Sequence, residues 1–88
     1  MIIYKYPLKV VPKQLIVIQE DWLPLSLQIQ NDIPILWALI DPANPIENRE
    51  IIMVGTGTSF NLNDDIIHLG TVQIGRYVWH YFMGEVKR

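Results

Sequence analysis

The sequence lacks several features that would direct it to a particular class of protein. It contains no cysteine, which excludes disulfide bonds and thiolate metal sites. Charged residues make up only 18% of the chain, the net charge is -2, and the 7 basic residues are scattered rather than clustered. Such a chain offers little to attract a nucleic acid, so we regard nucleic acid as a poor candidate for a partner.

Membrane insertion and secretion are also poorly supported. The longest apolar run, residues 33–40, is far shorter than the ~20 residues of a membrane-spanning helix. The first residues include no basic region that precedes an apolar run, as a secretory signal would. We therefore expect a soluble, cytoplasmic protein with no membrane partner.

The chain is rich in apolar residues. Half of its 88 residues are hydrophobic, which argues against disorder and is enough for one domain over residues 1–88. With so little charge for its surface, some apolar side chains should stay exposed on the monomer. A homodimer or a higher oligomer is therefore a reasonable expectation.

The spacing of apolar residues predicts strands and no long helix. Proline or glycine interrupts almost every segment, and no stretch keeps a helical period for three turns. Strands are expected at residues 1–6, 14–19, 25–30, 35–40, 50–54, 66–74 and 77–83, with loops or turns between them. The sequence thus predicts an all-β fold, a small antiparallel sandwich or partly open barrel of six to seven short strands.

Residues 35–40 read as the central strand and pair naturally with residues 25–30. A two-residue turn at residues 31–32 would place Leu36, Ala38 and Ile40 in the core with the leucines of the partner strand. Trp37 then lies on the opposite face, beside polar side chains. Either a second layer covers Trp37, or Trp37 belongs to a partly exposed patch.

The last two strands should form a hairpin around residues 75–76, with glycine first as in a type II′ turn. This register sets Gly70 opposite Tyr81, where the ring could pack over a bare backbone. It also places His68 and His80 on opposite faces, so the two histidines should not share a metal. We expect no metal site and no cofactor.

Several residues are candidates for contacts with a ligand or partner. The Gly-Thr-Gly-Thr run at residues 55–58 could offer backbone N–H groups to a phosphate, although neither a helix start nor a P-loop lysine follows, so a loop that ends a strand is the simpler reading. His80, flanked by aromatic residues, is a better ligand candidate than His68, although a strand histidine is usually just packed. The candidate ligand- or partner-binding residues are Trp37, Asp41, Thr56, Gly57, Thr58, Tyr77 and His80.

Neither a catalytic set nor a calcium loop is recognisable. The 2 serines, Ser26 and Ser59, lie outside any Gly-x-Ser-x-Gly elbow, and no nucleophile, base and acid stand at a telling spacing, so we expect no enzyme. The acidic and amide residues at 61–65 lack the spacing of a calcium-binding loop and are better explained as a solvated turn.

Five short stretches carry a family resemblance when they are taken in order and at their spacing. They are residues 4–8 (YKYPL), 36–42 (LWALIDP), 55–57 (GTG), 69–73 (LGTVQ) and 78–82 (VWHYF). Together they resemble an uncharacterised family of small proteins in tailed phages and prophages. The resemblance implies a phage accessory protein and implies no reaction. Members of that family often carry histidine after Gly-Thr-Gly, where this chain has Thr58.

Three hypotheses follow for function. The first is a non-enzymatic phage accessory protein that docks on a host protein, such as a component of antiviral defence, and blocks it. The second is an oligomeric sponge that sequesters a nucleotide signal, with Trp37 or Tyr77 stacking on the base and residues 55–58 binding phosphate. The third, a β barrel that binds single-stranded nucleic acid, is disfavoured by the acidic balance.

Overall fold

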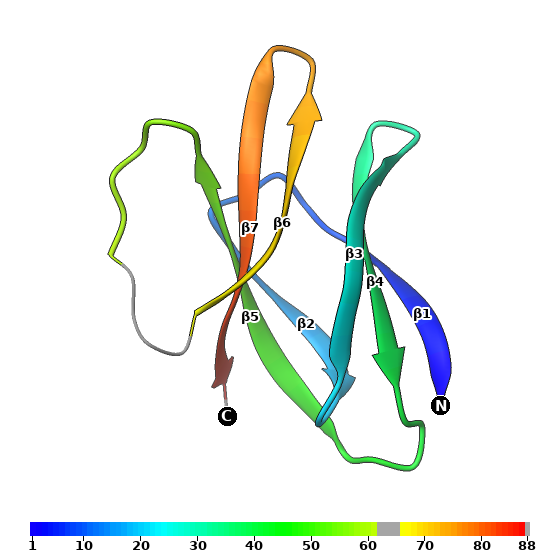
Figure 1. Cartoon of the computed structure of the whole chain (residues 1–88). Helices are drawn as coiled ribbons and strands as arrows, with labels where there is room; N and C mark the ends of the chain where they lie inside the picture. Colours follow the sequence, from blue (N-terminus) through cyan, green and yellow to red (C-terminus); the bar gives the residue numbers. More distant parts are fainter. Residues whose placement is uncertain (62–65, 88) are drawn as a thin grey trace.

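The computed structural model describes residues 1–61 and 66–87 as two facing β-sheets (Figure 1). The strands are β1 (Ile2–Pro7), β2 (Lys13–Gln19), β3 (Leu23–Gln30), β4 (Ile33–Ile40), β5 (Ile46–Gly55), β6 (Ile67–Ile74) and β7 (Tyr77–Lys87). One sheet has the order β1-β4-β3 and the other β2-β5-β7-β6, with every neighbouring pair antiparallel. The predicted all-β fold is confirmed, as an open sandwich that does not close into a barrel.

No helix long and apolar enough to cross a membrane occurs within residues 1–61 and 66–87. β1 carries Lys5 and Pro7, and β2 begins at Lys13 directly after Pro12. β1 is the outer strand of the three-stranded sheet and β2 is an outer strand of the four-stranded sheet. Lysine and proline at such edges discourage pairing with other chains.

Both predicted hairpins form with the turns that the sequence specifies. Asn31 and Asp32 adopt positive φ angles of 52° and 64°, as the two central residues of a type I′ turn do. Gly75 has a φ of 61° while Arg76 is not left-handed, which fits the predicted type II′ turn. The two turns lie at the same end of the sandwich, the upper end in Figure 1.

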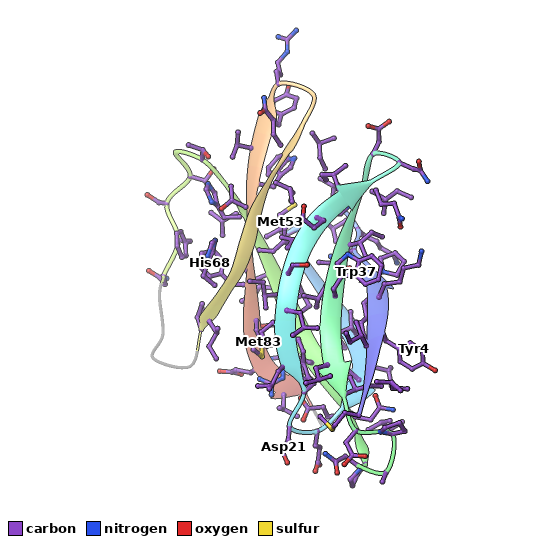
Figure 2. All side chains as sticks on the ribbon, turned by 45° about the vertical axis from the view of Figure 1, so that its right-hand side comes forward. Tyr4, Asp21, Trp37, Met53, His68 and Met83 are labelled. Carbon is purple, nitrogen blue, oxygen red and sulfur yellow. The ribbon has the colours of Figure 1, made fainter. Side chains whose placement is uncertain are left out.

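The core lies between the inner faces of the sheets. Leu36, Ala38 and Ile40 are fully buried, as the parity of the β3–β4 hairpin predicts. Met53 and Met83 lie between the two sheets (Figure 2).

The fully buried Tyr81 donates its hydroxyl proton to the carbonyl oxygen of Lys9 at 3.0 Å, so the one polar atom of its side chain is satisfied. Burial raises the pKa of the Tyr81 phenol.

The face of β3 that was predicted to carry Leu25, Leu27 and Ile29 is less buried than expected. Leu27 is 8% exposed, but Leu25 is 49% exposed and Ile29 37% exposed. A β-bulge between Pro24 and Ser26 breaks the alternation, so Leu25 leaves the face that Leu27 occupies. Ile29 pairs with Pro34, close to the hairpin turn.

The loop predicted at residues 41–49 is shorter than expected, because β5 already begins at Ile46. Ile46 pairs with Gln19, and the register continues along the whole of β2. The polar residues of this segment suit a strand because Arg49 and Glu47 form an ion pair, with 2.7 Å between Nε and Oε2. Pairing with β2 thus outweighs a composition that is typical of a loop.

Gly70 allows the two sheets to approach each other. It pairs with Tyr81, as predicted. However, a Cβ atom at Gly70 would lie 2.8 Å from the Cβ of Leu27 in β3, and the nearest atoms to it all belong to Leu27 rather than to Tyr81. The glycine is therefore required by the neighbouring sheet and not by the tyrosine ring.

Candidate functional site

The segment that follows β5, residues 55–58, is a tight turn held against β7. The amide of Thr58 donates to the carbonyl of Gly55 at 3.1 Å, and Gly57 has a φ of 87°, as the third residue of a type II turn requires. The amide of Thr56 donates to the carbonyl of Val78 at 3.2 Å. A Cβ atom at Gly55 would lie 3.0 Å from Cζ3 of Trp79, so the indole ring packs directly over this backbone.

A chain of hydrogen bonds connects this turn to β7 and β6. Thr56 Oγ1 lies 2.8 Å from His80 Nε2, His80 Nδ1 lies 2.9 Å from Thr71 Oγ1, and Thr71 Oγ1 lies 3.3 Å from His68 Nε2. Thr71 has a single hydroxyl proton. When Thr71 donates this proton to one histidine, the Thr71 oxygen accepts a hydrogen bond from the N–H of the other histidine. The two neutral imidazoles are then protonated either both on Nε2 or both on Nδ1, so their tautomers are coupled.

The prediction that His68 and His80 lie on opposite faces is wrong. A β-bulge between His68 and Gly70 inserts Leu69 into the β6–β7 ladder. His68 therefore pairs with Phe82 and shares the outer face of the four-stranded sheet with His80, with 6.4 Å between the ring centroids. Figure 2 shows His68 on the side of this sheet that faces away from the three-stranded sheet.

The turn separates two hollows. The first, of about 250 Å³, lies on the outer face of the sheet, and we call it the loop hollow. It is lined by Val54, Gly55, Thr56, Gly57, Thr58, Phe60, His80 and Phe82. The ring centroids of Phe60 and Phe82 are 5.4 Å apart, so the lining combines an aromatic pair with threonine and histidine side chains.

The second hollow, of about 440 Å³, lies beside the tip of the β6–β7 hairpin, and we call it the hairpin hollow. It is lined by Gly55, Thr56, Thr58, Arg76, Tyr77, Val78 and Trp79. Tyr77 and Trp79 stack with 5.9 Å between ring centroids and 26° between ring planes. Two aromatic residues, an arginine and two threonines therefore line one space.

Five of the seven predicted site residues thus come together around one turn: Thr56, Gly57, Thr58, Tyr77 and His80. Trp37 does not join them, because it lies on the outer face of the three-stranded sheet, where Lys5 Nζ is 5.9 Å from the ring centroid. Asp41 lies in the β4–β5 connection and accepts from the amide of Ala43 at 3.0 Å, which is a structural turn contact.

Sequence reasoning missed Arg76, Phe60 and Phe82 as lining residues. Arg76 was placed at a turn, but nothing in its position alone indicated that the residue 55–58 turn would lie beside it. The predicted hairpin register did place Trp79 on the same face as Tyr77, so that pair carried a usable signal. Of the polar segment at residues 61–65, residues 62–65 lie outside the described part of the chain.

The Thr56–His80–Thr71 chain differs from the triad of serine hydrolases in its third member. Thr56, His80 and Thr71 follow the order of nucleophile, base and orienting group. The orienting group here is a neutral hydroxyl, whereas serine hydrolases place a carboxylate there to stabilise the imidazolium. In the described residues, no carboxylate joins this chain of hydrogen bonds. The same residues contain no cluster of three potential metal ligands.

A family model described as a domain of unknown function (DUF7352) matches residues 1–88. The chain belongs to this family. The match covers the whole DUF7352 sheet sandwich, including the residue 55–58 turn and both hollows. Comparison with curated proteins gave no match. Comparison with solved structures gave none either.

Proposed function

We propose that this DUF7352 protein is a non-enzymatic binding protein that docks on another protein through the outer face of its three-stranded sheet. The observation that carries the proposal is a row of apolar side chains across that face. Ile3 pairs with Leu39, and Leu39 pairs with Leu23, so the three lie side by side on β1, β4 and β3. Ile3 is 59% exposed and Leu23 56% exposed.

Trp37 extends this row by one step along β4. Its neighbours across the sheet are Lys5 and Ser26, and Lys5 also donates to the side chain of Gln30 at 3.2 Å. Tryptophan is one of the residue types enriched at the hot spots of protein interfaces, which lie within an apolar centre and a polar rim. We call Ile3, Leu23, Trp37 and Leu39 the outer apolar strip.

The resemblance to phage proteins supports a more specific role. In this proposal the protein is a phage accessory protein that acts in the cytoplasm of the host cell. Its partner is a host protein, such as a component of antiviral defence, whose activity it blocks by occupying a surface. The low charge of the chain supports a contact that is made mainly by apolar groups.

Capture from host lysate tests the docking proposal. The tagged protein should retain one host protein in stoichiometric amounts, and Leu39→Ser should lose it, because a serine in the middle of the row removes apolar contact from all three strands. Leu15→Ser is the matched control, since Leu15 is 56% exposed and lies on β2 in the other sheet. The proposal fails if no host protein is retained stoichiometrically, or if both variants retain it equally.

Self-association through the same strip is the second candidate, and the exposure of Ile3 and Leu23 is the observation that favours it. Sedimentation velocity separates it from docking on a host protein. If the strip joins copies of this chain, the wild-type protein and Leu15→Ser should sediment as a homodimer or a higher oligomer, and Leu39→Ser should sediment as a monomer. A wild-type protein that remains monomeric at high concentration excludes self-association.

A further inference from the structure

The hairpin hollow carries an inference that is independent of the outer apolar strip. Tyr77 lies on the face of β7 that also carries the fully buried Tyr81, yet it is 61% exposed. Its ring is not loose, because it stacks on Trp79, which in turn packs against the core and over Gly55. The result is an aromatic plane, supported from one side, that lines an open space of about 440 Å³.

A cation stands at the edge of this plane. The turn between β6 and β7 places Arg76 next to Tyr77 and in the lining of the hairpin hollow. In the described part of the chain, Arg76 forms neither an ion pair nor a side-chain hydrogen bond. Its guanidinium group therefore keeps its full capacity for a bidentate contact with an anionic group.

Two threonines complete the lining of the hollow. Thr56 and Thr58 reach it from the residue 55–58 turn. Thr58 Oγ1 and Trp79 Cζ3 lie 3.5 Å and 3.0 Å from the position of a Cβ atom at Gly55, so this hydroxyl is on the same side of Gly55 as the indole ring. The Thr56 amide is held by the carbonyl of Val78, and the Thr58 amide by the carbonyl of Gly55. The backbone of this part of the lining is thus held by two hydrogen bonds before any ligand arrives, which lowers the ordering cost of binding.

These groups together match one ligand chemistry. An aromatic plane stacks on a nucleobase, a guanidinium group binds a phosphate, and the Thr58 hydroxyl can exchange a hydrogen bond with a sugar or phosphate. We propose that the hairpin hollow binds a free mononucleotide, with the base on Tyr77 and the phosphate on Arg76. A nucleic-acid strand is a poorer ligand, because the chain has a net charge of -2 and its 7 basic residues are scattered along the sequence.

An NMR titration tests the proposal directly, because each of the 3 tryptophans gives its own indole N–H signal. The probes are AMP, adenosine and inorganic phosphate, each added up to about 10 mM, so that a millimolar Kd is still detected. AMP should move the Trp79 signal along a saturable curve and leave the signal of the buried Trp22 in place. Adenosine should bind about tenfold more weakly or worse, because it lacks the charge-assisted contact with Arg76.

Two exposed substitutions assign the roles. Arg76→Gln should reduce the affinity for AMP to that for adenosine and leave adenosine binding unchanged. Tyr77→Ala should weaken both about tenfold, since it removes one stacking surface. Lys13→Gln is the control with the same change in charge, on β2 and outside the hollow. Circular dichroism checks that each variant is folded.

The proposal is overturned if AMP leaves the Trp79 signal unmoved, or if adenosine binds as tightly as AMP. It is also overturned if inorganic phosphate alone binds as tightly as AMP, which would mean a simple anion site. None of these outcomes bears on docking through the outer apolar strip, because Arg76, Tyr77 and Trp79 belong to the other sheet.

Discussion

Replacing Gly70 by alanine should destabilise the sandwich, because the added methyl group has no room between β6 and β3. Its Cβ atom would lie 2.8 Å from Leu27 Cβ and 3.2 Å from Leu27 Cδ2. Carbon atoms in favourable contact are about 3.5–4.0 Å apart, so the two strands would have to separate by roughly 1 Å. A change of rotamer at Leu27 cannot relieve the contact, since its Cβ is fixed to the backbone.

The expected loss follows from two opposing effects. Overpacking of a core costs about 1–3 kcal/mol, and the stiffer unfolded chain of an alanine variant returns about 0.4–1 kcal/mol. We therefore expect Gly70→Ala to lower the free energy of unfolding by about 1–2 kcal/mol, out of a total near 4–13 kcal/mol for a chain of this length. Urea unfolding followed by circular dichroism measures this loss, and the midpoint should fall by roughly 1 M.

Gly84→Ala is the matched control. A Cβ atom there would lie 2.9 Å from Glu50 Oε1 and 3.1 Å from Ile52 Cδ1, which are the mobile ends of long side chains. This variant should lose less stability than Gly70→Ala. Removing the Leu27 side chain with Leu27→Gly should abolish the penalty of Gly70→Ala in the double variant. A Gly70→Ala variant that is as stable as the wild type, or whose loss of stability is the same with and without the Leu27 side chain, would contradict the clash between β6 and β3.

Two further predictions concern the core tyrosine and the histidine network. Tyr81→Phe removes the hydroxyl that donates to the Lys9 carbonyl and should cost about 1 kcal/mol at neutral pH. Because burial raises the pKa of Tyr81, the folded protein keeps this proton where the unfolded chain loses it, so wild-type stability should fall as the pH rises above about 10. The free energy of unfolding of the phenylalanine variant, measured by urea titration on either side of that pH, should fall less than that of the wild type. An equal fall would contradict the assignment of this pH dependence to Tyr81. Thr71→Val should change the free energy of unfolding by less than about 0.5 kcal/mol, because Thr71 is exposed. It should nevertheless alter the imidazole ¹⁵N shifts of both His68 and His80, and unchanged shifts would mean that Thr71 does not couple their tautomers.

Local patterns were sufficient to predict the elements and part of their register. The β3–β4 pairing from residues 26 to 37 follows from the two-residue turn, because a strand has a period of two and each residue's face is then determined. What was not predictable is the pairing of strands distant in sequence. β5 pairs with both β2 and β7, and this places the residue 55–58 turn beside Trp79 and His80. Nothing near residues 55–58 specifies that pairing, so the two hollows could not be derived from the sequence.

The misplaced histidine has a different cause, because its signal was present in the sequence. Val72 and Ile74 are apolar at even positions, whereas Ile67 and Leu69 are apolar at odd positions, so the alternation changes phase within one predicted strand. A glycine stands at the point of change, and an isolated glycine in a strand often marks a bulge. In the structure, Val72 is buried, and Leu69 and Ile74 pack against the core. The extra residue at the bulge allows the apolar side chains on both sides of it to face the core. His68 is thereby turned outward onto the Thr71–His80 network. The hydrophobic requirement of the core thus decides where the polar network forms.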